Sequence, residues 1–431
     1  MNNKKYLILI PIIIIFLFVI SILLPSEIWS NFVDIFNIIL AISATIIAIV
    51  EYRESEEENR KEKFSSIYSI FSQNQYQLRQ YLNDIEFSIN KNNENLLFYK
   101  NDWMCLDKNP IPISKISLIA DTKQNNSDYS IIKKTFKKYN ILPNNDLSLS
   151  DNLLIYQNSH IYNLPCYGLS NIDIDDNTIK ITIKEGFYFD FINSCFPYGL
   201  ELALSYKNKN KNKLIIRNNN SIYDFSNRFS TIGIVTLLVL KNVRKDDKIS
   251  NYILIHQRGN GVAESQGLIN AVPGSTFQQT SDFRYKDLNE RLGKEGIAYN
   301  ITREIYEEIF NVREFSYKTS LNKIQSEPLL HVVENNTYYI GSGINPINVY
   351  FEMLTITVLD FINPDIQTLF GSNNYYEIKN KIEPNYEGNI FIEELNTDIL
   401  TYYRYNTQSA PTLQTICSII LNNDRCRALF N

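Results

Sequence analysis

The chain has 431 residues, of which 44% are hydrophobic and 21% charged, and its net charge at pH 7 is −5. This length has room for two or three structural units, and the acidic balance gives no reason to expect a surface for duplex nucleic acid. The five cysteines are scattered, odd in number and without a Cys-x-x-Cys pair: Cys105, Cys166, Cys195, Cys417 and Cys426. We therefore expect core thiols in a reducing compartment, not disulfides or a zinc site.

Two apolar runs open the chain. Tyr6–Leu24 carries no charge and spans about 28 Å as a helix, enough to cross a bilayer. The second run, Phe32–Val50, follows after only Pro25–Asn31, which favours a transmembrane hairpin. A signal peptide is the competing interpretation of the first run, but its apolar core is usually shorter and no A-x-A site follows. Lys and Arg flank both outer ends and are missing from the loop, so we expect a multi-pass protein of the inner membrane with its soluble part in the cytoplasm.

The second run also carries small residues at helical spacing, Ala41, Ala44 and Ala48. Small residues on one face let helices approach closely in lipid. This face suits packing within one hairpin and association between protomers about equally.

Residues 51–99 are expected to form a charged linker and an amphipathic helix. Glu56–Arg60 and Glu57–Lys61 stand four residues apart, which supports a helix. From Phe64 to Ile89, apolar residues recur at three-, four- and seven-residue steps. This helix is either a stalk that continues from the second span or a core-facing helix of the soluble part.

Residues 100–225 read as a strand-rich cytoplasmic region to which the sequence assigns no chemistry. Thr178–Lys184 alternates apolar and polar residues, Glu185-Gly186 follows, and Phe187, Phe189 and Phe191 alternate again. This pattern predicts a β-hairpin that turns at Glu185-Gly186.

The region 226–431 is expected to form one domain. Its strands are predicted at Ile232–Leu240, Tyr252–Gln257, Gly267–Val272, Leu329–Val333 and Val349–Leu359, and a closing helix at Ala410–Leu421 with Pro411 at its start.

An acidic stretch lies in the middle of this domain. Glu295 is followed, after seven residues, by Arg303-Glu304-Ile305-Tyr306-Glu307-Glu308. If Ile301–Ile309 is a helix at 100° per residue, Glu304, Glu307 and Glu308 share one sector. Three neighbouring carboxylates repel one another unless a cation lies among them, and Mg²⁺ is the usual partner of such oxygen ligands. A solvated acidic helix face is the alternative.

The whole pattern, E-x7-R-E-U-x-E-E, resembles the core of the Nudix box. In that family a loop and helix hold Mg²⁺ against a diphosphate while water attacks a phosphorus atom. The resemblance implies metal roles for Glu304, Glu307 and Glu308, of which Glu307 and Glu308 would be catalytic in an active enzyme. It implies that Glu295 and Arg303 are structural partners within the box.

Two departures from the family pattern point to an altered pocket. The family's first glycine falls at position 289, which is Asn289, and the nearest Pro-Gly is Pro273-Gly274, about twenty residues before Glu295. The closing glycine is replaced by Phe310, although Asn311 is a residue that adopts the left-handed conformation of a helix cap. Arg258 and Gly274 are the candidate ligand-binding residues beside the box.

The predicted architecture is similar to the two-transmembrane Nudix effectors of bacterial cyclic-oligonucleotide anti-phage systems (CBASS, the CD-NTase-associated proteins). It is an α+β chain with a two-helix transmembrane hairpin (1–50), a helical stalk (51–99), a strand-rich region (100–225) and a Nudix-like α/β/α sandwich (226–431). In that class a partner cyclase makes a cyclic nucleotide, the soluble domain senses it, and the membrane part oligomerises and disrupts the inner membrane, causing abortive infection. The alternative is a membrane-anchored, Mg²⁺-dependent hydrolase of a nucleoside diphosphate derivative.

Overall fold

The computed structural model describes residues 15, 18, 19, 26–85, 96–121, 130–157, 161–175, 177–209, 214–219, 221–259, 267–279, 287–294, 296–312, 328–382 and 388–430. The chain divides into two compact units. The first holds Met1–Phe64 and Ile141–Asp146, and the second holds Ser65–Asn140 and Leu147–Asn431. The fold class is α+β, as the sequence predicts.

Helix α2 (Ser26–Gln73) contains the second predicted span and is, within the described residues, the one helix long and apolar enough to cross a membrane. Its apolar stretch is not buried within the structure, and Ile35, Ile38, Ile42, Ile46 and Ile49 are all about half exposed. The first predicted span, 6–24, lies outside the described residues except for Ile15, Phe18 and Val19.

The loop predicted between the two spans is wrong from Ser26 onward, because α2 already begins there. The charged part of α2 carries one of the predicted pairs, with Lys61 Nζ 2.9 Å from Glu57 Oε1.

The predicted amphipathic helix is two helices. α2 ends at Gln73, and α3 (Gln75–Ile85) begins after Asn74. The Gln75 side chain donates to the carbonyl of Phe71 (2.6 Å), so side-chain hydrogen bonding accompanies the interruption. Residues 86–89 of the predicted helix lie outside the described part of the chain.

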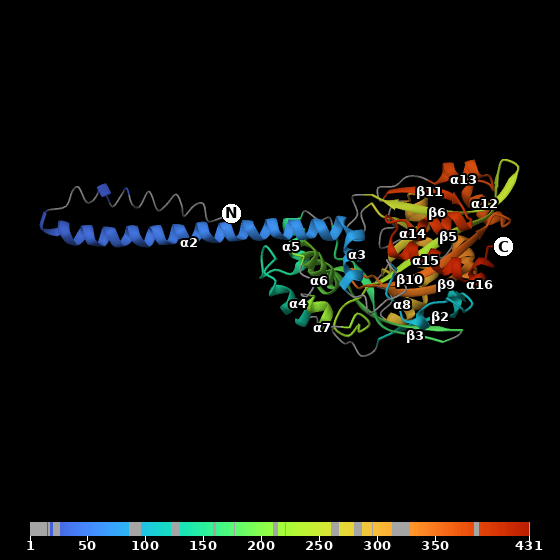
Figure 1. Ribbon diagram of the computed structural model, residues 1–431, viewed down its shortest axis with the longest axis horizontal. Coiled ribbons are helices and arrows are strands. Elements are labelled where there is room, and N and C mark those ends of the chain that lie inside the picture. Colours follow the sequence, from blue (N-terminus) through green and yellow to red (C-terminus); the bar gives the residue numbers. More distant parts are fainter. Residues whose placement is uncertain are drawn as a thin grey trace. The chain divides into compact units, whose positions relative to one another are not determined.

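The second unit is built around a mixed sheet (Figure 1). Its strand order is β1 (Ile111–Pro112), β9 (Thr337–Ile344), β10 (Phe351–Asp360), β5 (Ile232–Lys245), β6 (Lys248–Arg258) and β11 (Gly388–Glu394). β5 and β10 run parallel, and β7 (Ile269–Ala271) and β8 (Gly274–Thr276) add to β6 and β5. These strands confirm the predictions at 232–240, 252–257 and 349–359.

Helices cover the central strands, which is why β5 and β10 are mostly apolar and almost entirely buried between Ile232 and Leu240 and between Phe351 and Leu359. Val235, Leu237 and Val239 of β5 form one core with α14 (Thr397–Tyr405) and α15 (Pro411–Asn422), the predicted closing helix (Figure 1). Successive strand residues point to opposite faces, so the equally buried Leu238 and Leu240 face away from that core. On the sheet, α9 (Ile297–Glu304) contacts β5 and α11 (Pro328–Asn336) contacts β10.

A smaller sheet belongs to the same unit. Its order is β2 (Ile116–Ala120), β4 (Ile179–Phe187) and β3 (Pro165–Ile174), with β2 parallel and β3 antiparallel to β4. Bridges from Gly168 to Thr231 and from Cys166 to Gln278 join β3 to the chain of the main domain. The remaining helices are α4 (Ser130–Lys137), α5 (Leu149–Tyr156), α6 (Tyr188–Lys207), α7 (Ile215–Asn219), α8 (Leu288–Lys294), α12 (Pro364–Phe370), α13 (Tyr375–Lys381) and α16 (Asp424–Arg427).

Two secondary-structure predictions are wrong. The hairpin at Glu185-Gly186 does not form, because β4 continues through it to pair with β3, and α6 begins at Tyr188. The Asp190 carboxylate accepts the Phe187 N–H (2.9 Å), which favours a helix start over a second strand. Leu329–Val333 is helical, within α11, where the apolar run packs on β10 and α9.

Candidate functional site

The glutamate-rich stretch forms a helix at the sheet, but not a regular one. α9 ends at Glu304, and Ile305–Ile309 form a π-helical turn, in which the Phe310 N–H bonds the carbonyl of Ile305 (3.4 Å). Ile301, Ile305 and Ile309 are buried and hold the helix on the core. π turns are rare and recur at functional sites. Because of this turn, the regular spacing of 100° per residue predicted for Ile301–Ile309 does not hold over its second half.

The closing end of this helix confirms one prediction. Asn311 has φ 50°, the left-handed conformation that a closing glycine would adopt. The Val312 N–H then bonds the carbonyl of Tyr306 (3.0 Å), which completes the cap.

Arg303 lies between two of the box carboxylates. Its Nη1 is 3.1 Å from Glu307 Oε2, and its Nη2 donates to Glu304 Oε1. These side chains are nearly buried, with 8% of Arg303, 11% of Glu304 and 13% of Glu307 exposed. Because a buried carboxylate is costly without a partner, the arginine offsets part of the repulsion within the box.

Glu308 connects the box to the loop that carries Pro273-Gly274. It is 4% exposed, and its Oε2 accepts the backbone N–H of Gly274 (3.1 Å). A second link joins the same segments, from the Ser275 hydroxyl to Asn300 Oδ1 (3.1 Å). Gly274 is therefore in contact with the box, although about thirty residues of sequence separate it from Glu308. This contact is needed if Gly274 is to bind a ligand together with the box.

The other predicted residues of the site are placed differently. Glu295 lies outside the described residues. Arg258 ends β6, where it pairs with Gly388 of the edge strand β11, and among the described residues it makes no hydrogen bond to the box. Two further residues of the site, Asn300 and Ser275, were not predicted from the sequence. Asn300 stands three residues before Arg303, a spacing that places both on one helix face and could have marked it.

The donor chemistry of the box fits a divalent cation, because three carboxylates follow one another within little more than one helical turn. Within the described residues, no three acidic, histidine or cysteine side chains are already grouped as a metal site.

The cysteines behave as core thiols. All five are free and buried, as predicted. Burial raises the pKa of Cys105 to about 11 and that of Cys417 and Cys426 to about 12. At neutral pH these thiols are protonated and therefore poor nucleophiles.

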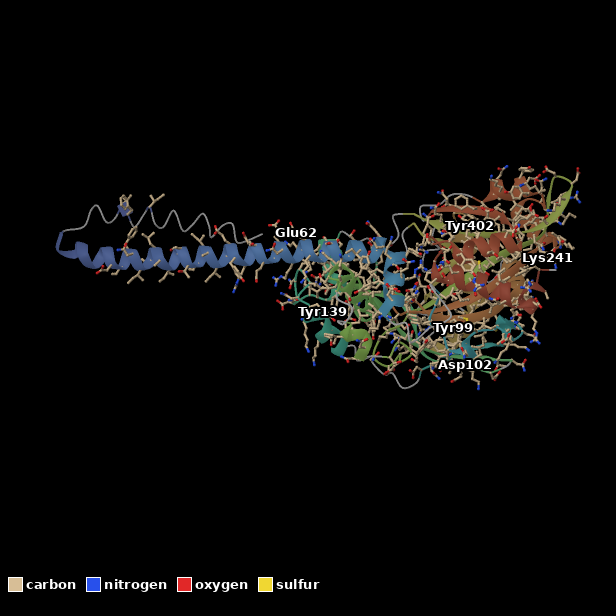
Figure 2. All side chains as sticks on the ribbon, viewed as in Figure 1. Glu62, Tyr99, Asp102, Tyr139, Lys241 and Tyr402 are labelled. Carbon is tan, nitrogen blue, oxygen red and sulfur yellow. The ribbon has the colours of Figure 1, made fainter. Side chains whose placement is uncertain are left out.

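A second buried carboxylate has a structural role. Glu201 of α6 accepts the backbone N–H groups of Ile216 (2.8 Å) and Arg217 (3.2 Å) at the start of α7. The Tyr139 hydroxyl, on the turn after α4 (Figure 2), donates to the same carboxylate. Burial raises the pKa of Glu201, and these hydrogen bonds work in the opposite direction. The group ties α4, α6 and α7 together.

No protein-family model matches the chain, and no curated protein matches it in sequence.

Proposed function

We propose that the chain is a membrane-anchored sensor of a cyclic nucleotide, with a Nudix-like α/β/α domain in its C-terminal half, that acts as an effector of a CBASS antiviral system. In this proposal the soluble part lies in the cytoplasm, a partner cyclase supplies the ligand, and the membrane part self-associates and damages the inner membrane. The long apolar helix α2 supports membrane anchoring. The helices on the central sheet, with α9 on β5, support the Nudix-like assignment.

The observation that carries the sensing proposal is the way the box glutamates are already engaged. Arg303 joins Glu304 and Glu307, and Glu308 holds the N–H of Gly274. A hydrolase needs such carboxylates on Mg²⁺, whereas a sensor needs them to shape a pocket. With their charge offset from within the chain, they favour a binding site over a catalytic one.

The decisive experiment is titration of the full chain, in detergent, with a panel of cyclic oligonucleotides in the presence and absence of Mg²⁺. We expect one member to bind saturably and to remain intact. Co-expression with the matching cyclase should then depolarise the inner membrane. Binding of no member of the panel, or toxicity that persists after deletion of residues 1–50, would contradict the sensor proposal.

The second candidate is a Mg²⁺-dependent Nudix hydrolase of a nucleoside diphosphate derivative. It is favoured by the chemistry of the box, since Glu304, Glu307 and Glu308 follow one another on one stretch of helix and carboxylate oxygens are the ligands that Mg²⁺ prefers. Turnover of such substrates, abolished by the double substitution Glu307→Gln and Glu308→Gln, would support it. If that variant binds Mn²⁺ as well as the wild type, the box is not a metal site.

A further inference from the structure

The two edges of the main sheet differ in how well they are protected from a further strand. At one edge, β1 is two residues long and ends in Pro112, which has no N–H to donate. At the other edge, within the described residues, β11 pairs with β6 over all seven of its residues without a register shift. The sequence of β11 holds no proline or lysine, the residues that commonly guard an edge. β11 is therefore an edge on which another strand can pair.

The hydrogen-bond pattern shows which backbone groups of β11 face outward. Leu395, one residue beyond the strand, donates its N–H to the carbonyl of Asn251 in β6 (2.8 Å). Bonded and non-bonded pairs alternate along an antiparallel ladder, so Phe391 also bonds β6. Ile390 and Ile392, on either side of it, therefore direct their N–H and C=O groups away from β6.

These outward groups fit a second copy of the same strand. In an antiparallel pair, an outward residue must lie opposite another outward residue. With a two-fold axis at Phe391, Ile390 of each copy lies opposite Ile392 of the other, and the two Phe391 side chains meet in a non-bonded pair. The acidic end, Glu393–Glu394, then lies opposite the uncharged Gly388–Asn389. No like charges face each other, and each apolar residue of β11 faces an apolar residue.

Neighbouring registers match less well. A shift that places Ile390 opposite Glu394, or Phe391 opposite Asn389, replaces apolar pairs by pairs of an apolar and a polar residue. In the register centred on Phe391, the charge of Glu394 is balanced within its own chain, because Lys248 Nζ lies 2.6 Å from its Oε1. The apolar pattern of β11 thus selects one register.

Exposed aromatic side chains lie on the same side of the sheet. Phe391 is 43% exposed and pairs with Ile255, whose side chain belongs to the core shared with α14. It therefore lies on the face that α14 covers, and Tyr402 and Tyr405 of that helix are 57% and 68% exposed. Aromatic residues are enriched at protein interfaces, so this face offers contact area beyond the strand itself.

We propose that two copies of the chain pair through β11, antiparallel, about a two-fold axis at Phe391. The main sheets of the two copies then form one continuous sheet, and the same residues contribute from both sides, as a two-fold interface requires. The inference concerns the sheet and not the apolar helix, and it holds whether or not the chain senses a nucleotide.

Cysteine cross-linking of the full chain in detergent tests this geometry. A non-bonded pair has Cα atoms about 4.5 Å apart, which is within the range of a disulfide. With a mild oxidant, Phe391→Cys should therefore give a cross-linked dimer as its main product. Ile119→Cys is the matched control, because Ile119 is 41% exposed on β2, and it should remain a monomer. The five native cysteines are buried and add little background.

Association through the apolar helices alone does not hold the two introduced cysteines at this distance. Equal cross-linking of Phe391→Cys and Ile119→Cys overturns the proposal, whatever the chain does with a nucleotide.

Two double variants test the register. Ile390→Lys with Ile392→Glu places unlike charges opposite each other, whereas Ile390→Lys with Ile392→Lys places like charges there. Each dimer holds two such pairs, so the first variant should dimerise with a Kd at least about tenfold lower than the second, measured by sedimentation in detergent. Equal Kd values show that the register is wrong. Both variants carry charges at the same two positions, and fluorescence of the buried Trp103 checks their folding. If neither folds, Phe391→Cys decides the question.

Discussion

Replacing Arg303 by glutamine tests whether charge compensation holds the box together. The substitution leaves Glu304 and Glu307 nearly buried, with 11% and 13% of their side chains exposed and their shared cation removed. Breaking a buried ion pair by removing one partner costs about 3–5 kcal/mol. Because some exposure remains, we expect the lower end of this range, which corresponds to a change of about a hundredfold in the unfolding equilibrium.

Urea unfolding of the full chain in detergent measures this loss. A Trp29→Phe background leaves Trp103, which is 2% exposed, as the single tryptophan reporter. Arg291→Gln is the matched control, because it removes the same charge from a 9%-exposed arginine whose partner, Glu185, is 44% exposed and stays solvated without it.

Two further measurements sharpen the test of Arg303. Adding Glu304→Gln and Glu307→Gln to Arg303→Gln should restore most of the lost stability, since the two carboxylates that Arg303 paired with are then removed as well. If the glutamates bind Mg²⁺, the ion at a hundred times its Kd should stabilise the single variant by about 2.7 kcal/mol. The reasoning fails if Arg303→Gln is as stable as Arg291→Gln, or if the triple variant is no more stable than the single one.

The remaining predictions concern topology, coupling, pH and assembly. A cysteine introduced at Asn31 should react with an impermeant maleimide from outside the cell, and protection there would contradict the orientation. Arg79→Met removes bonds to Gln414 Oε1 (2.9 Å) and the Ser409 carbonyl (3.2 Å), so amide exchange in α3 should accelerate; unchanged protection would show that Arg79 does not hold this helix. Burial lowers the pKa of Lys184 from 10.5 to about 8, so between pH 8 and pH 10 the unfolded chain binds more protons than the folded one. The free energy of unfolding of the wild type, relative to that of Lys184→Met, should therefore rise from pH 8 to pH 10. A difference that does not change with pH would contradict this prediction. Under the sensor proposal, Ala44→Leu with Ala48→Leu should weaken killing without changing nucleotide affinity, and equal killing by the variant would exclude this face as the contact.

Local sequence patterns correctly predicted those strands and helices that are buried in the same way along their whole length. Ile232–Leu240 and Val349–Leu359 are mostly apolar because both sheet faces are covered, and Ala410–Leu421 combines a first-turn proline with helical spacing. The left-handed Asn311 was also predictable, since the helix needed a cap and asparagine accepts that conformation. In each case the deciding interaction lies within a few residues.

Partners distant in sequence decided the rest. Leu329–Val333 is short and apolar, which fits a strand or a helix equally, and its packing on β10 selected the helix. Glu185-Gly186 is a residue pair typical of turns, but its pairing with β3 keeps it within strand β4.

At the site, the spacing of the glutamates along the chain is enough to predict that they lie on one helix, because spacing is a local property. The groups that pair with them are set by the fold. The backbone N–H of Gly274, which is distant in sequence, donates to Glu308, and the π turn fixes the position at which Arg303 pairs with Glu307. Such contacts depend on burial and on long-range packing, which no run of neighbouring residues encodes.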